Sequence, residues 1–194
     1  MDLGLRDKRV LVTAGAGGIG CVIAQRFVAE GARVAVCDID DAALEECAAQ
    51  TPGLLALRAD VAVSADVGSL FARLQQSFGG LDVLVNNAGV SGPTKPVEEV
   101  TDEEWNRTLA VNVTGQFYAV RPAVPMFRSV GGGAIVNMSS VAGRMEMPMR
   151  APYSTSKYAV RGFTDVLTVE LGALNVRVDA ILRGLVNGPR GAAA

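Results

Sequence analysis

Histidine is absent from all 194 residues of the chain. That absence excludes Ser-His-Asp and Cys-His nucleophilic sites and most catalytic zinc sites, because each needs an imidazole. Only three cysteines occur, Cys21, Cys37 and Cys47, an odd number without a CxxC spacing. They fit reduced thiols in a cytosolic protein better than a disulfide framework or a zinc site. We therefore expect a cytoplasmic protein without a bound metal.

The chain also lacks a large excess of charge of either sign, and it lacks long apolar runs. The formal net charge is −2 and no basic patch stands out, which argues against a nucleic-acid partner. No apolar run approaches the length of a membrane span. Residues 1–12 show neither the apolar core nor the cleavage site of a secretory signal, so we expect no membrane association. A chain that is 49% hydrophobic and 20% charged is typical of a globular protein, and we expect one domain over residues 1–194.

Short apolar runs alternate with longer helical stretches along the chain. The expected strands are Arg9–Thr13, Arg33–Cys37, Leu54–Ala59, Leu81–Asn86, Ala134–Met138 and Val176–Leu182. Most are apolar throughout, which is typical of parallel strands buried on both faces. The repeated β-α units predict an α/β fold, a Rossmann-like doubly wound parallel sheet flanked by helices on both faces.

Three helices matter for the function. One is expected from Gly18 to Glu30, and another from Tyr153 to Leu174. The third spans Thr101–Val120, because residues 101–104 form a capping box at its start. We expect it to end near Pro122 or Pro125, since proline interrupts helical hydrogen bonding.

A glycine-rich turn joins the first expected strand to the helix that follows. Gly15, Gly17 and Gly20 satisfy the GxGxxG fingerprint, with Gly18 and Ile19 between them. Glycines let the backbone approach a pyrophosphate, and the start of a helix offers free N–H groups to an anion. Any tight strand-to-helix turn favours glycine, but the place of this one inside a β-α-β unit favours a nucleotide cradle.

An acidic residue, Asp38, ends the second expected strand about twenty residues after the turn, where a carboxylate can accept hydrogen bonds from adenosine ribose hydroxyls. It would repel a 2′-phosphate, and neither the glycine-rich turn nor the two residues after Asp38 include Lys or Arg. The pattern favours NAD over NADP. The alternative is that Asp38 caps the next helix, although Asp40 or Asp41 can also do so.

Tyr153 and Lys157 are four residues apart in the last expected helix, so they share a face. A cation beside a phenol favours the phenolate, which suits acid–base chemistry. Such a pair is commonly a plain surface contact, and Ser140 and the glycine-rich turn are what favour catalysis. Met145, Met147 and Met149 alternate just before the tyrosine and either line an apolar substrate pocket or simply pack.

Taken together from Lys8 to about Pro189, these motifs resemble the short-chain dehydrogenase/reductase family, in its short single-domain branch. The residues that carry the resemblance are the turn Thr13–Gly20, Asp60-Val61, Asn86–Gly89, Asn112, Ser139-Ser140, Tyr153 and Lys157. The resemblance implies an NAD-dependent oxidoreductase that interconverts a secondary alcohol and a ketone. A homodimer or homotetramer through the two long helices is also implied.

The resemblance also assigns roles. Tyr153 would be the general acid/base, Lys157 would hold the nicotinamide ribose and favour the phenolate, and Ser140 would orient the substrate. Asn112 would relay protons toward Lys157. The expected cofactor contacts are the turn residues Gly15, Gly17, Gly18, Ile19 and Gly20, with Asp38, Asp60, Val61, Asn87, Ala88, Gly89, Tyr153, Lys157 and Val186.

Three features depart from the family pattern. Ala14 stands where the first turn glycine is expected, with Gly15 beside it able to supply the flexibility. Arg183-Gly184 replaces a Pro-Gly pair, and the chain stops at Ala194, where the family continues into a substrate-covering region. These departures keep two alternatives open: an NAD-binding protein with little or no activity and a regulatory or assembly role, and an NADPH-dependent ketone reductase.

Overall fold

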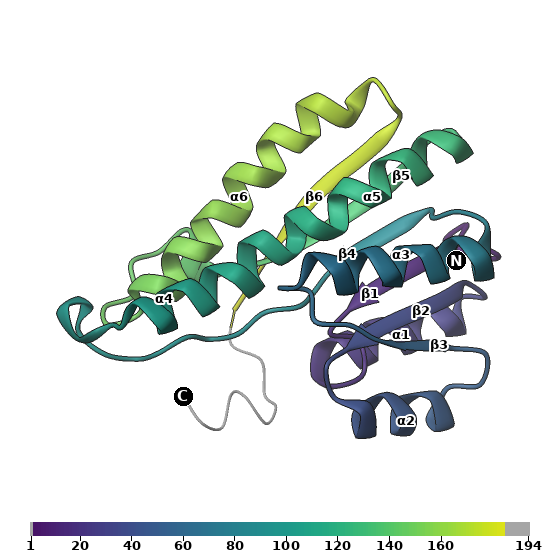
Figure 1. Ribbon diagram of the computed structural model, residues 1–194. Coiled ribbons are helices and arrows are strands. Elements are labelled where there is room, and N and C mark those ends of the chain that lie inside the picture. Colours follow the sequence, from purple (N-terminus) through teal and green to yellow (C-terminus); the bar gives the residue numbers. More distant parts are fainter. Residues whose placement is uncertain (1, 185–194) are drawn as a thin grey trace.

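One six-stranded sheet forms the centre of the protein, and a computed structural model describes residues 2–184 (Figure 1). The strands are β1 Arg9–Thr13, β2 Arg33–Asp38, β3 Leu55–Arg58, β4 Val83–Asn86, β5 Gly133–Ser140 and β6 Val176–Arg183. All neighbouring strands are parallel, in the order β3-β2-β1-β4-β5-β6. This is the doubly wound Rossmann order, so the predicted fold is confirmed.

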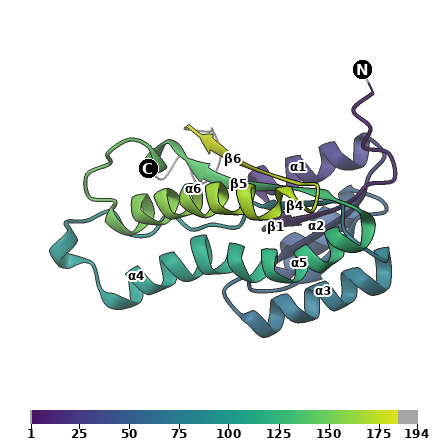
Figure 2. The same cartoon turned by 90° about the horizontal axis from the view of Figure 1, so that it is seen from above.

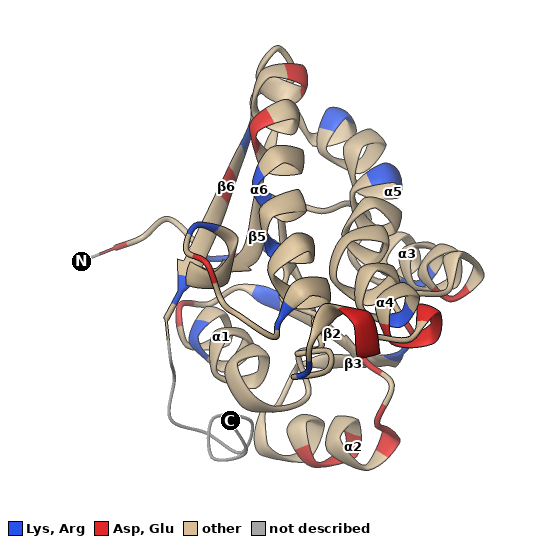
Figure 3. Ribbon diagram, turned by 90° about the vertical axis from the view of Figure 1, so that its left-hand side faces the viewer, with Lys and Arg blue, Asp and Glu red and all other residues tan. Residues whose placement is uncertain are grey.

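Helices cover both faces of the sheet (Figure 2). They are α1 Gly18–Ala29, α2 Asp41–Gln50, α3 Ser64–Phe78, α4 Asp102–Leu109, α5 Gly115–Val130 and α6 Ala151–Gly172. A π-helical segment, Ala110–Thr114, joins α4 to α5, and short 3-10 turns occur at Val97–Glu99 and Val141–Gly143. Viewed along the sheet, α3, α5 and α6 lie on one side and α1 and α2 on the other (Figure 3). Among the described residues, no helix has both the length and the apolar character that crossing a membrane requires.

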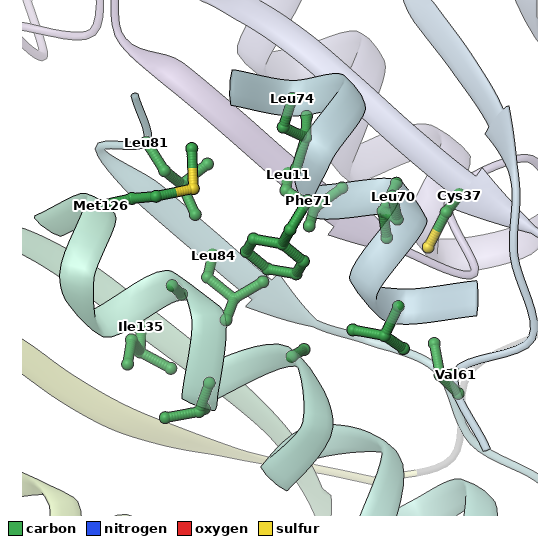
Figure 4. Packing of buried hydrophobic residues seen from close by; sticks show 14 of the residues in the cluster. Leu11, Cys37, Val61, Leu70, Phe71, Leu74, Leu81, Leu84, Met126 and Ile135 are labelled. Atoms are coloured by element: carbon green, nitrogen blue, oxygen red, sulfur yellow. The ribbon is translucent and has the colours of Figure 1, made fainter. Parts of the chain in front are cut away.

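The alternation of strand side chains produces two hydrophobic cores. Leu11 of β1 points to the α3, α5 and α6 side, where it joins Phe71 and Leu84 in a continuous cluster (Figure 4). Its neighbours Val10 and Val12 point the other way, toward α1 and α2. Each fully buried aliphatic side chain contributes about 2 kcal/mol through loss of apolar surface from water. β1 is therefore held on both of its faces, and this packing sets the position of the glycine-rich turn that follows its carboxyl end.

The helix that was expected to end near Pro122 or Pro125 continues to Val130. Both prolines are at least partly exposed, and so are Tyr118 and Arg121, whose carbonyls lose their N–H partners. Exposed carbonyls of this kind can be hydrated, so the helix continues. The opposite side of α5 is held by deeply buried residues such as Phe127. The helix ends instead at Gly131, whose φ of +83° gives the left-handed cap that glycine allows.

Candidate active site

A cleft of about 260 Å³ opens at the carboxyl edge of the sheet, where β1 has β2 on one side and β4 on the other. Doubly wound sheets bind ligands at this point, where the strand order reverses. The lining residues come from the ends of β1 to β4 and from the helical stretch after β4: Ala14, Asp38, Ile39, Ala59, Asp60, Val61, Ala88, Gly89, Val90, Ser91, Arg107 and Val111. Five predicted cofactor contacts, Asp38, Asp60, Val61, Ala88 and Gly89, therefore lie around one hollow.

The glycine-rich turn is built differently from the expectation in one respect. Ala14 itself adopts the left-handed conformation, with φ +48°, so Gly15 does not supply that flexibility. Gly15 is required for another reason, since a Cβ there would lie 2.6 Å from Cγ1 of Val36. A Cβ on Gly20 would collide with the Ala14 carbonyl, whereas Gly17 faces open space at the start of α1. The turn is thus closely packed behind and open in front, which fits a pyrophosphate at a helix N-terminus.

Asn87 holds the turn from the other half of the sheet. Its Nδ2 donates to the carbonyls of Thr13 and Ala14, both at 3.0 Å. In return, Oγ1 of Thr13 accepts from the backbone N–H groups of Asn87 and Ala88, both at 3.0 Å. The Asn87 side chain is therefore a brace for the turn, a use that the sequence did not reveal.

Asp38 lies at the end of β2 with its carboxylate beside the glycine-rich turn. Oδ2 accepts a 3.4 Å hydrogen bond from the Ala16 N–H, and Oδ1 accepts one of 2.8 Å from the Ile39 N–H. The cap of α2 is Asp40, which accepts from the Ala43 N–H at 3.1 Å. The alternative in which Asp38 caps the helix is therefore wrong, and Asp38 lines the cleft instead.

Arg107 is a cleft residue that the sequence analysis missed. Its Nη1 lies 3.3 Å from Oδ2 of Asp60, whose Oδ1 accepts from the Ala62 N–H at 2.8 Å. Nothing in the local sequence links α4 to the end of β3, because 47 positions separate the two residues. The ion pair neutralises Asp60 and leaves Asp38 as the cleft carboxylate without a cationic partner among the described side chains.

Ser139 and Ser140 have different surroundings at the end of β5. The Ser139 hydroxyl donates to the Lys157 carbonyl at 2.9 Å, so it joins β5 to α6. The Ser140 hydroxyl oxygen accepts from the Ala142 N–H at 3.2 Å, which leaves its proton for another acceptor. This geometry favours Ser140 as the serine that meets a substrate.

Lys157 is a buried cation, with only 5% of its surface exposed. Its Nζ donates to the Met138 carbonyl at 2.8 Å and lies 5.7 Å from the centre of the Tyr153 ring. Desolvation, followed by repulsion from Arg183, lowers the pKa of Lys157 to about 8. A lysine whose charge is this costly to bury is typical of a functional site.

Asn112 lies in the π-helical segment, a local irregularity that is frequent at functional sites. Its Oδ1 accepts from the Val90 N–H at 2.8 Å, and its Nδ2 donates to the Val90 carbonyl and to Oγ of Ser156, both at 2.9 Å. Ser156 in turn donates to the Tyr153 carbonyl at 2.6 Å. The side chain therefore connects the loop after β4 to the helix that holds Tyr153 and Lys157. Its proton-relay role stays a prediction.

Arg150 also lies beside the tyrosine and was not foreseen. Its guanidinium carbon lies 5.1 Å from the centre of the Tyr153 ring. The same group donates to Oγ1 of Thr94 at 2.7 Å and to the Ser91 carbonyl at 2.9 Å. Tyr153 thus has a cation from the loop side and another, Lys157, from its own helix.

Two predictions about substrate and cofactor contacts have separate outcomes. Met145, Met147 and Met149 are all exposed, so they do not pack in the core, and none of them lines the cleft. Val186 lies outside the described residues. Within residues 2–184, no group of His, Cys, Asp and Glu side chains is arranged to hold a metal ion.

Comparison with known proteins gives the family. The model of the short chain dehydrogenases matches residues 8–193. The chain belongs to the short-chain dehydrogenase family. Its members are oxidoreductases, and this short-chain dehydrogenase is 38% identical over 190 residues to a 2-(R)-hydroxypropyl-CoM dehydrogenase of Xanthobacter autotrophicus, covering 94% of this chain and 76% of the relative.

Solved structures agree with this assignment. A 3-ketoacyl-(acyl-carrier-protein) reductase from Brucella melitensis, complexed with NADH, has a TM-score of 0.94 and 32% identity, covering 97% of this chain and 79% of its own. An NAD⁺-bound xylitol dehydrogenase has a TM-score of 0.91 and 33% identity, covering 96% and 73%. These neighbours support a nicotinamide cofactor for this short-chain dehydrogenase.

Proposed function

We propose that this short-chain dehydrogenase uses NAD to interconvert a secondary alcohol and a ketone, with Tyr153 as the general acid/base. The observation that carries the proposal is the Lys157 ammonium, buried beside the Tyr153 ring at the carboxyl edge of the sheet. Neither structural packing nor a surface ion pair accounts for a desolvated cation at this position. Five of the expected cofactor contacts, Asp38, Asp60, Val61, Ala88 and Gly89, line the neighbouring cleft and support the proposal.

Each residue has a defined task in the proposed reaction. Lys157 is fixed by the Met138 carbonyl, so its remaining ammonium protons can hold a ribose hydroxyl. Tyr153 as phenolate takes the proton of the substrate hydroxyl, and Ser140 donates its free proton to the substrate oxygen to orient it. The nicotinamide, when bound, supplies hydride transfer. In the direction of ketone reduction, the Tyr153 hydroxyl returns the proton to the oxygen.

The choice of NAD over NADP rests on Asp38. Its carboxylate lines the cleft and has no cationic side chain paired with it among the described residues, so a 2′-phosphate would meet uncompensated negative charge. We expect Asp38→Asn to reduce the preference for NAD over NADP by about tenfold, an effect of about 1.4 kcal/mol. Asp41→Asn, an exposed neighbour paired with Arg58, is the control and should leave the preference unchanged. Tighter native binding of NADP than of NAD would contradict the proposal.

Hydride transfer tests the reaction directly. The purified chain is given NAD⁺ and a panel of secondary alcohols, and the absorbance of reduced nicotinamide is followed. Tyr153→Phe should lower kcat by about 10²–10⁴-fold, the usual share of general acid–base catalysis, while calorimetric NAD binding persists. The control is Tyr158→Phe, an exposed tyrosine five residues further along α6. Unchanged turnover in Tyr153→Phe would remove this residue from the mechanism.

A binding protein with little or no activity is the rival function. It is favoured by Arg183, which lies beside Ser140 in the register of β5 and β6 and repels Lys157. Tight NAD binding without turnover of any alcohol or ketone, even at high pH, would favour this rival. In either case we propose a single domain over residues 1–194.

A homodimer or homotetramer through the long helices is part of the proposal. Val166 and Val169 on α6 are 60% and 85% exposed, and Phe117 on α5 is 44% exposed. Exposed apolar side chains on two neighbouring helices support an interface between copies. Light scattering of the native chain and of Val169→Glu measures this, and a native monomer would contradict it.

A further inference from the structure

Two thiols from different helices meet behind the glycine-rich turn. Sγ of Cys21, in the first turn of α1, lies 3.6 Å from Sγ of Cys47 in α2. Cys21 is partly exposed, whereas Cys47 is only 2% exposed. Neither residue belongs to the proposed catalytic or cofactor contacts. The contact thus places a partly exposed cysteine next to a buried one.

The pair also touches the cofactor cradle. Cys21 follows Gly20 directly, and Sγ of Cys47 lies 3.8 Å from the carbonyl oxygen of Gly15. The cradle is tightly packed at Gly20, because a Cβ there would lie 2.6 Å from Nδ2 of Asn87. A displacement of the thiols is therefore transmitted to the turn.

We propose that Cys21 and Cys47 are a redox modification site, at which a hydroperoxide forms a reversible disulfide that weakens nucleotide binding. The effect on NAD rests on the proposed function, whereas the bond itself does not. In the first step the Cys21 sulfur attacks the peroxide, the O–O bond breaks, and a sulfenic acid and an alcohol or water form. In the second step the Cys47 sulfur attacks the Cys21 sulfur, the S–O bond breaks, and water leaves. Two thiols are oxidised and one peroxide is reduced.

The order of the two steps follows from burial. Cys21 is the more exposed of the two residues, so we expect a peroxide in solvent to react there first. Desolvation, followed by the contact with Cys21, raises the pKa of Cys47 to about 11, which keeps it a thiol at neutral pH. Cys47 is thus the resolving partner, and we expect the second step to accelerate as the pH rises.

We expect the bond to move the cradle. A disulfide has an S–S length of about 2.05 Å, so the sulfurs have to approach by about 1.5 Å from 3.6 Å. We expect that approach to draw the start of α1 toward α2 and to remove the contact of the Cys47 thiol with the Gly15 carbonyl. The N–H groups at the start of α1 then no longer point to the same place. We expect NAD to bind about tenfold more weakly, since displacements of about 1 Å in a binding site have effects of this size or larger.

The test uses the full chain without any substitution. It is treated with hydrogen peroxide, alkylated, digested and analysed by mass spectrometry, and NAD affinity is measured by calorimetry before oxidation, after oxidation and after dithiothreitol. We expect a peptide linking Cys21 to Cys47, weaker NAD binding, and recovery of both on reduction. Because coupling between binding free energies is reciprocal, saturating NAD should lower the equilibrium fraction of the linked peptide at a fixed redox potential.

Matched variants isolate the pair. Cys21→Ser and Cys47→Ala should keep NAD affinity constant during oxidation. Cys37→Ala should behave as the native chain does, since Cys37 is fully buried in β2 and desolvation raises its pKa to about 12. Absence of the linked peptide, or Cys21 ending as a sulfinic acid, overturns the proposal, and so does a linked peptide without a change in affinity. If the reduced chain binds no NAD, the proposed function fails while the peptide analysis still decides whether the bond forms.

Discussion

Replacing Lys157 by methionine should make the folded chain more stable at neutral pH. The pKa of Lys157 falls from 10.5 to about 8 on folding, chiefly through desolvation and then through Arg183. At about 1.4 kcal/mol per pKa unit, the buried charge costs about 3 kcal/mol. The substitution also leaves the Met138 carbonyl without its donor, which costs about 1–2 kcal/mol. We expect a net gain of about 1–2 kcal/mol in the free energy of unfolding at pH 7.

The pH dependence gives the sharper test. Because the folded pKa of Lys157 lies below the unfolded one, the unfolded chain binds more protons between about pH 8 and pH 10.5. The native chain therefore gains stability as the pH rises through this window, and the advantage of Lys157→Met shrinks. By about pH 9.5, about 2 of the 3 kcal/mol should have been recovered by the native chain.

Urea unfolding at several pH values measures both quantities. The difference between native and variant is used, since other groups titrate equally in both. Lys8→Met is the control for the loss of a lysine, because the Lys8 side chain is 50% exposed. A Lys157→Met chain that is less stable at pH 7, or a difference that does not change with pH, would refute the reasoning that the lysine is held at a cost.

Other substitutions test the surrounding framework. Burial alone would raise the pKa of Asp82, but hydrogen bonds from Arg9 outweigh it and leave the pKa lowered. The Asp82–Arg9 pair therefore stabilises the folded chain above the usual carboxyl pKa, and this stability is lost as the pH falls through the pKa of Asp82 in the folded chain. In urea unfolding between pH 2 and 6, Asp82→Asn should lose less stability with falling pH than the native chain does. An equal dependence on pH in both chains would contradict this role of Asp82. Ala14→Gly should raise the urea midpoint by an amount equivalent to about 1 kcal/mol, because alanine at φ +48° is strained; a lower midpoint would refute the strain. Asn112→Ala should destabilise by about 2 kcal/mol in the same assay, since it leaves the Val90 N–H and carbonyl unpaired, and a neutral effect would show that both find other partners.

Much of the fold is readable from the sequence because its signals are local. The apolar strands and the capping box at Thr101 depend on neighbours within a few positions, and each is found close to where it is expected. The prolines of α5 misled for the opposite reason. Their cost depends on whether the freed carbonyls face solvent, and tertiary packing decides that.

The candidate site likewise contains residues that the sequence predicts and contacts that it does not. Spacing alone identifies Tyr153, Lys157, Asp38 and the turn glycines as candidates. The Asp60–Arg107 ion pair and the Asn87 brace join residues that lie 47 and 73 or more positions apart. A single sequence holds no signal for such pairs. The uses of these side chains become visible only once the strands are placed side by side.

The brace from Asn87 has a consequence for how the protein is assembled. The glycine-rich turn is complete in sequence by residue 20, yet its carbonyls are held by an amide that is synthesised 67 residues later (87 − 20). The first three strands and their helices would therefore emerge from the ribosome with the cradle unfinished. A fragment that ends before β4 should not bind a nucleotide, and the cradle cannot be transplanted as a short motif. During synthesis, the chain should therefore become able to bind a nucleotide only after β4 and Asn87 have packed against β1.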